Sequence, residues 1–154
     1  RMEGRLAKKE GAFKKRYSLK FPIIAVEDTA PMPSIAELHI ALADIRPAIR
    51  RTILVDTDTG FYRLHHILQI AFGWQNRHLF QFKAAGYTIS LPDPEFEQYG
   101  KIIDAREISL KEVFHEPGEL MEYEYDFGDS WVHEITLKQF LPAQKSVKYP
   151  VCTD

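Results

Sequence analysis

The chain has almost no cysteine and no long apolar run. Its single cysteine, Cys152, cannot form a disulfide within these 154 residues, which favours a reducing compartment. No apolar stretch approaches the roughly 18 residues that a helix needs to cross a bilayer. The first residues carry charge but lack the apolar segment of a secretory signal. These absences predict a cytoplasmic protein that does not bind a membrane.

Several catalytic signatures are missing as well. The sequence contains no glycine-rich phosphate loop, no Gly-x-Ser-x-Gly nucleophile elbow and no Cys-x-x-Cys pair. No histidine stands near Cys152 in the sequence, so nothing marks this thiol as a nucleophile. No complete catalytic set is visible, and the sequence leaves open whether the protein is an enzyme.

Charge is nearly balanced, with 20 Lys and Arg against 22 Asp and Glu, which provides no global field to attract nucleic acid. Residues 1–16 differ, because seven basic and two acidic residues give them a net charge of +5. We interpret residues 1–16 as a flexible basic arm and residues 17–154 as a single domain. The arm would dock on nucleic acid, or it is a solvated or vector-derived segment without a role.

The hydrophobic pattern predicts an α+β domain. Residues 36–42 alternate as a half-buried strand does, and apolar residues in 61–72 recur at helical spacing up to a terminating Gly73. Residues 56–60 are rich in side chains that cap helices, and Ser109 is suited to cap a short one. Hairpin signals between the other strand-like runs favour antiparallel pairing. We expect a curved, mostly antiparallel sheet of about five to seven strands. The helix at about 61–72 would pack on one face, with a short second helix at about 110–114.

The segment from Tyr123 to Glu134 is the most unusual. Gly128 and Asp129 stand between two strand-like runs and predict a two-residue hairpin turn. This turn would place Asp126 opposite Trp131 and Glu124 opposite His133, and so bring four side chains to one face. A carboxylate opposite His133 would keep the imidazole charged, orient it as a base or join it as a metal ligand. The alternative is a cross-strand ion pair on a solvated face, with Asp129 binding turn amides.

Other candidates lie outside this hairpin. His65 and His66 are neighbours on the predicted helix, and they lack the i, i+4 spacing of a zinc-binding helix. Trp74 would either pack under the sheet, with its indole N–H on a carbonyl, or form a pocket rim with Asn76 and His78. Two arginines at the start of a strand, Arg50 and Arg51, would either grip an anionic ligand or pair with acidic residues of the domain.

Four motifs, in this order, resemble the plasmid Ri ORF-three-like family, also described as the passenger or TnpR-like protein of an insertion element. They are Ile45-Arg46-Pro47-Ala48-Ile49-Arg50-Arg51, Leu64-His65 through Gly73-Trp74, His78-Leu79-Phe80-Gln81-Phe82, and Tyr123-Glu124-Tyr125-Asp126-Phe127-Gly128-Asp129-Ser130-Trp131-Val132-His133. The resemblance runs from about Ala36 to Cys152. It implies an α+β fold and occurrence on plasmids and mobile elements, without an established activity.

The chain departs from the family pattern in two places. The family has His-Leu-His where this chain has His78-Leu79-Phe80, which removes one candidate metal ligand. The family pattern also continues beyond Cys152 into a Pro-Pro-Glu-Asp-Cys-Gly-Gly-like segment, whereas the sequence ends at Asp154. We therefore expect a domain that is truncated at its C-terminus.

Two hypotheses about function follow. The first is a non-catalytic binding or interaction module of plasmid or mobile-element biology, for which the candidate binding residues are Trp74, Trp131, Glu124, Arg50, Arg51 and His65. The alternative is a metal-dependent hydrolase or nuclease with His78, Asp126, Asp129 and His133 as ligands or general base. The candidate ligands of a divalent metal would be His78, Asp126 and His133. The alternative requires these side chains to converge around one cleft.

Overall fold

The computed structural model describes residues 34–95 and 101–154. The predicted basic arm, residues 1–16, lies outside the described residues. The described helices and strands, in chain order, are β1 (Ile35–Leu42), β2 (Arg50–Asp56), α2 (Phe61–Phe72), β3 (Phe80–Ala84), β4 (Tyr87–Ser90), β5 (Ile102–Asp104), α3 (Leu110–Val113), β6 (Leu120–Tyr125), β7 (Trp131–Leu141) and β8 (Val151–Cys152).

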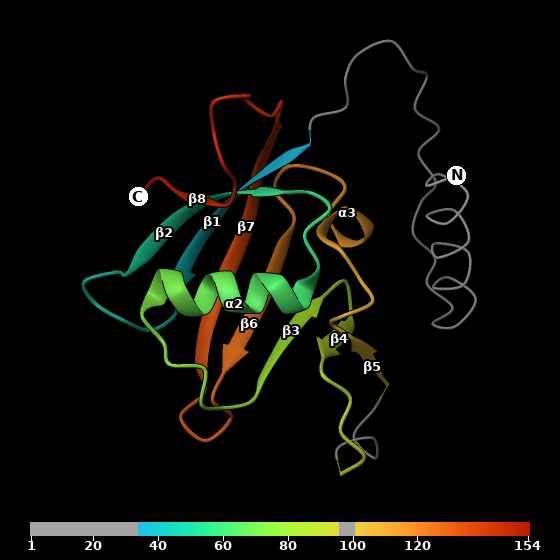
Figure 1. Cartoon of the computed structure of the whole chain (residues 1–154). Coiled ribbons are helices and arrows are strands. Elements are labelled where there is room, and N and C mark those ends of the chain that lie inside the picture. The colour runs from blue at the N-terminus through green and yellow to red at the C-terminus, as the bar shows by residue number, and fades with distance from the viewer. Residues whose placement is uncertain (1–33, 96–100) are drawn as a thin grey trace.

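The eight strands form one open sheet in the order β5-β4-β3-β6-β7-β1-β2-β8. Neighbouring strands are antiparallel except β4 and β5, which are parallel. Helix α2 lies across one face of the sheet (Figure 1). The predicted α+β class, the mostly antiparallel sheet and the single main helix are confirmed. The sheet exceeds the expected five to seven strands, and the unexpected β5 and β8 are only three and two residues long.

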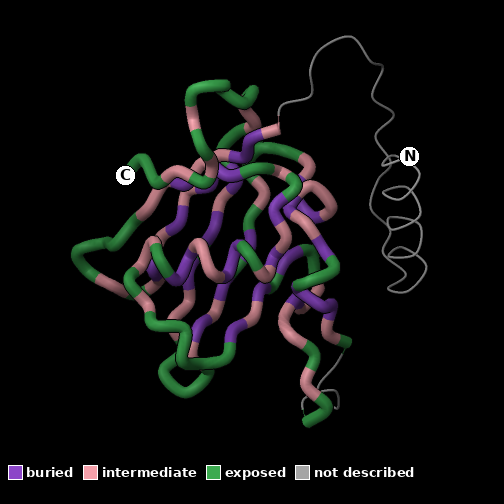
Figure 2. The backbone as a smooth tube through the Cα atoms, in the orientation of Figure 1, coloured by how far each residue is buried: buried purple, intermediate pink, exposed green. Residues whose placement is uncertain are grey.

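The core lies between α2 and the sheet, and along the longer strands buried residues alternate with less buried ones (Figure 2). The fully buried side chains of α2 include Phe61, Leu64 and Leu68, which recur at helical spacing. The opposite face of the sheet is not covered by α2. Among the described residues, no helix is long and apolar enough to span a membrane.

The start of α2 is held by a distant segment and not by the capping side chains expected in residues 56–60. The N-cap is Gly60, and no side chain caps the helix. Instead, the N–H groups of Phe61 and Tyr62 donate to the carbonyls of Ile108 and Ala105 at 3.0 and 2.9 Å. These contacts satisfy two of the backbone donors that a helix leaves free at its N-terminus.

The predicted two-residue turn at Gly128-Asp129 is wrong. Five residues, 126–130, connect β6 to β7, and the strands pair Tyr125 with Trp131 and Tyr123 with His133. Glu124 lies opposite Val132 and not opposite His133.

The register follows from burial. Side chains alternate along a strand, so a shift of one residue exchanges the two faces of β6. The observed register buries Tyr123 and Tyr125 on the face of α2, where they are 0% and 2% exposed. The predicted turn would have put Glu124 and Asp126 on that face. Burying two carboxylates in place of two aromatic rings would cost far more than a longer loop does.

At the other end of α2, Gly73 adopts the left-handed conformation, with φ of 72°, and closes the helix as predicted. We expect Gly73→Ala to lower the free energy of unfolding by about 1 kcal/mol, because a β-carbon disfavours this backbone conformation. The cost should come from the backbone alone, since no atom lies within 4 Å of a β-carbon built there. Urea denaturation would measure it. Gly73→Asn should cost less, because Asn tolerates this conformation; equal stability of all three proteins would contradict the prediction.

Candidate functional site

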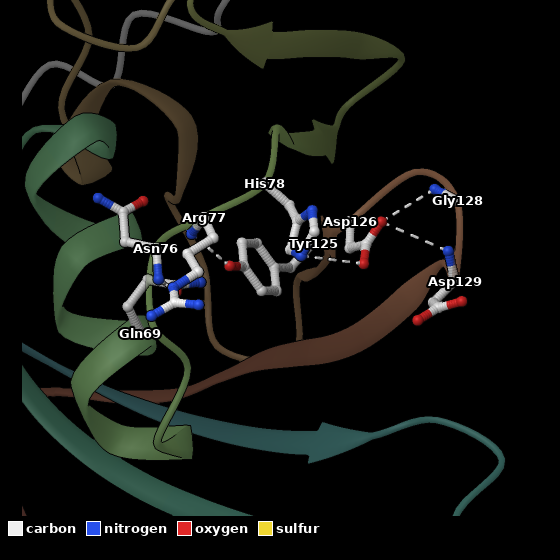
Figure 3. A network of polar contacts seen from close by, with 8 residues as sticks. All are labelled: Gln69, Asn76, Arg77, His78, Tyr125, Asp126, Gly128 and Asp129. Atoms are coloured by element: carbon white, nitrogen blue, oxygen red, sulfur yellow. Dashed lines mark hydrogen bonds and ion pairs between the residues drawn. The ribbon is translucent and has the colours of Figure 1, made fainter.

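A closed ring of hydrogen bonds joins α2, the segment after it and β6. The amide nitrogen of Gln69 donates to the Tyr123 hydroxyl at 2.9 Å, and this hydroxyl donates to Nδ1 of His65 at 2.7 Å. Nε2 of His65 donates to Oδ1 of Asn76 at 2.7 Å. The backbone N–H of Asn76 returns to Oε1 of Gln69 at 2.8 Å (Figure 3 shows these last two residues). Every donor in the ring faces an acceptor, so the ring fixes the tautomer of His65, with the proton on Nε2.

His65 is therefore a structural residue of the core. Its side chain is 1% exposed, and its ring stacks on Phe80 with centroids 3.7 Å apart. Burial lowers the pKa of His65 from 6.5 to about 4, against the opposing effect of the hydrogen bond to Asn76. His65 is thus neutral at physiological pH and turned away from solvent.

His133 is also used inside the core. The indole N–H of Trp74 donates to Nε2 of His133 at 3.1 Å, in place of the expected carbonyl. Because an indole can only donate, Nε2 carries no proton, and Nδ1 donates to the carbonyl of Tyr123 at 3.1 Å. Burial lowers the pKa of His133, which is 0% exposed. Both nitrogens are occupied, so the observed arrangement leaves neither available to a metal or to a substrate proton.

Two loops lie side by side where β3 and β6 meet (Figure 3). The backbone N–H of Arg77 donates to the Tyr125 hydroxyl at 2.8 Å, and the N–H of Asp126 donates to the carbonyl of Leu79 at 2.9 Å. Nε2 of His78 lies 3.5 Å from Oδ2 of Asp126. These contacts fix the segment after α2 against the β6–β7 loop, residues 126–130.

Asp126 shapes that loop. Its backbone is left-handed, with φ of 61°, and its Oδ1 accepts the N–H of Gly128 at 3.1 Å and that of Asp129 at 3.5 Å. A side-chain oxygen that binds the amides two and three residues ahead replaces a backbone turn. The result is a loop in which Phe127 stays 40% exposed.

The four residues of the metal hypothesis do not come together. His78 and Asp126 are adjacent, but His133 is enclosed in the core and Asp129 is exposed in the loop. Among residues 34–95 and 101–154, no group of three or more His, Cys, Asp or Glu side chains is placed to hold a metal ion. The single cluster expected from the sequence is therefore not formed.

The remaining candidate binding residues have separate surroundings. Arg51 donates from Nε to the carbonyl of Ala71 at 2.9 Å and lies over the ring of Phe72, so it binds the C-terminal end of α2. Arg50 is exposed at the start of β2. Trp131 is half-buried against Trp74, with ring centroids 5.4 Å apart. Of these predicted residues, Glu124 alone lines the cavity described next.

A cavity of about 700 Å³ lies on the face of the sheet opposite α2. Its floor comes from outward-facing residues of β3, β4, β5 and β6, namely Gln81, Thr88, Ser90, Ile102 and Glu124. The carboxylate of Glu124 accepts hydrogen bonds from Nε2 of Gln81 at 2.6 Å and from Oγ of Ser130 at 2.9 Å. The volume is in the range of small-molecule sites.

Two apolar side chains from the paired loops border this cavity. Leu79 is 53% exposed and Phe127 is 40% exposed, and both line it. Large apolar groups left in solvent beside a cavity are typical of a binding surface. The sequence analysis did not predict the cavity. One signal was available: Phe127 lies in the polar Asp-Phe-Gly-Asp loop, where an aromatic side chain cannot reach the core.

The comparison with known sequences shows the family. Residues 34–154 match the family described as plasmid pRiA4b ORF-3-like protein. The chain belongs to this family. The segment from Tyr123 to His133, which lies within this match, supplies the buried Tyr123 and His133 as well as the loop with Phe127.

Relatives of this ORF-3-like chain share sequence and fold. It is 36% identical over 111 residues to the uncharacterized protein y4hQ of Sinorhizobium fredii (strain NBRC 101917 / NGR234). That match covers 71% of this chain, which spans only 56% of the relative's length. A crystal structure of a protein of unknown function from Methanosarcina mazei Go1 is similar, with a TM-score of 0.70 and 28% identity. It covers 78% of this chain and 68% of the other.

The buried histidines make stability depend on pH. The unfolded chain binds a proton at His65 below about pH 6.5, whereas the folded chain does so only near pH 4. The free energy of unfolding should therefore have its full value above pH 6.5 and decrease as the pH drops toward 4. The decrease due to His65 should be roughly 3 kcal/mol. Urea denaturation between pH 7.5 and 5 would measure the slope. His65→Gln should reduce the slope and leave the part that His133 contributes, and His66→Gln, on the same helix, should leave the slope nearly unchanged. Identical slopes in all three proteins would refute the assignment.

Proposed function

We propose that this ORF-3-like chain is a non-catalytic binding module whose ligand occupies the cavity beside Leu79 and Phe127. The observation that supports this most directly is the cavity itself, which combines polar groups on its floor with exposed apolar groups at its border. Sites for small ligands have this composition, since the apolar surface supplies affinity and a few polar groups fix orientation. The family description, which names a plasmid, also supports a role in plasmid biology.

The arrangement of the two sheet faces supports binding over catalysis. The histidines that suggested chemistry, His65 and His133, are enclosed on the α2 face with their nitrogens hydrogen-bonded. A metal-dependent hydrolase would retain only His78 and Asp126 as adjacent groups. A pair without a third ligand is a weak basis for metal-assisted hydrolysis, so we favour the binding module.

A substitution that fills the cavity tests this proposal. Thr88 is half-buried on the cavity floor, and Thr88→Trp would place a large ring there at a position where a strand accepts aromatic residues. We expect small-molecule fragments detected by NMR with the unmodified protein to perturb the amides of Gln81 and Glu124. Thr88→Trp should weaken their binding at least tenfold.

Thr136→Trp is the matched control, because Thr136 is a half-buried residue of β7 outside the cavity. This variant should bind the same fragments as the unmodified protein. The proposal fails if no fragment binds at millimolar concentration, or if the fragments that bind are indifferent to Thr88→Trp.

A further inference from the structure

We propose that the cavity takes an organic cation, a primary ammonium or guanidinium group on an apolar stem, with Glu124 as the group that binds the charge. This inference rests on the proposed binding function and specifies its ligand. Its basis is a negative charge on the cavity floor that the described residues do not neutralise. Apolar side chains lie next to this charge, and a fully polar ligand would not pack against them.

Among the described residues, the hydrogen-bond partners of Glu124 are neutral. Its two carboxylate oxygens accept from the amide of Gln81 and the hydroxyl of Ser130, one donor each. Within the described part of the chain, Glu124 forms no ion pair. A carboxylate offers about four acceptor positions, so two remain for a ligand.

The two donors also hold Glu124 in place. Gln81 is its direct neighbour across the β3–β6 pair, and Ser130 lies in the loop that carries Phe127. A carboxylate with a fixed orientation suits a charge-assisted hydrogen bond, which is stronger than a neutral one. The position of Glu124 on a strand and not on a free loop keeps it directed at the cavity.

The other charges of the cavity do not offset Glu124. Among the described residues, Asp93 and Lys101 are the other charged residues that line it, one of each sign. Their formal charges cancel, so the described lining carries the net negative charge of Glu124. An anionic ligand would be repelled there, while a neutral one would leave the carboxylate without a countercharge.

The apolar border selects the stem of the ligand. Leu79 and Phe127 lie on one side, and Tyr87, Leu91 and Ile102 also line the cavity. A stem of a few methylene groups or one aromatic ring would remove these surfaces from water. An aromatic side chain such as Phe127 is also a suitable neighbour for a cation.

Matched probes of different charge test the inference. Phenethylamine and agmatine supply the two cations, and 2-phenylethanol and phenylacetate supply neutral and anionic analogues of the first. We expect two-dimensional NMR titration of the whole chain to give the cations dissociation constants at least tenfold lower than those of the two analogues. Glu124→Gln should weaken phenethylamine and agmatine about tenfold or more and leave 2-phenylethanol unchanged.

Glu122→Gln is the control, because Glu122 is an exposed acidic residue of the same strand and lies outside the cavity. It removes the same charge and should alter cation binding less than twofold, which separates a local contact from the general field of the protein. Circular dichroism would verify that both variants are folded.

The outcomes separate the two proposals. Binding of the neutral or anionic probe in the cavity, with no preference for the cations, would overturn the cation assignment and leave the binding function standing. Equal losses in Glu124→Gln and Glu122→Gln would also overturn it. Failure of all four probes to bind would reject the cation assignment, and the fragment experiment with Thr88→Trp would then decide the binding function by itself.

Discussion

The hydroxyl of Tyr123 is the contact on which the arrangement of this domain depends. It accepts a hydrogen bond from Gln69 and donates one to His65, both on α2, while Tyr123 itself stands on β6. A buried polar group without a partner is costly, so the four members of the ring, which include Asn76, are stable only together. The ring thereby links α2 and the segment that follows it to the buried face of β6.

The site on the other face is a consequence of this arrangement. With Tyr123 and Tyr125 directed at α2, the alternation along β6 turns Glu124 to the opposite face, next to Gln81. The Tyr125 hydroxyl accepts the N–H of Arg77 and keeps the segment after α2 near the β6–β7 loop. This proximity brings Leu79 and Phe127 to the same cavity. The core thus determines the geometry of the surface on the other face of the sheet.

The sequence predicted the elements that depend on local signals. The bounds of α2 and the left-handed Gly73 follow from periodicity and backbone freedom, and both are found as expected. The turn at Gly128-Asp129 failed because a local preference for a tight hairpin competed with the burial of two tyrosines, and burial won. The cavity could not be foreseen, since its floor combines four strands whose order in the sheet depends on long-range pairing. Of the predicted binding residues, Glu124 lines this cavity. The sequence pointed to Glu124 through a pairing with His133, and that pairing was wrong.

The segment from Tyr123 to His133 therefore has two roles: its inward side chains bind the α2 side of the core, and an outward side chain lines the cavity. Inward residues of this segment, Tyr123 and His133, bind groups of α2 and of the loop after it, and burial keeps His133 neutral. An outward residue, Glu124, lies on the opposite face, where no described residue pairs with it as an ion. Histidines and carboxylates that lie close in sequence are thus separated by the sheet itself. Separation by the sheet prevents the acid–base pair of Glu124 and His133 that the sequence suggested. It leaves the carboxylate of Glu124, beside apolar groups, as the feature that we propose a ligand recognises.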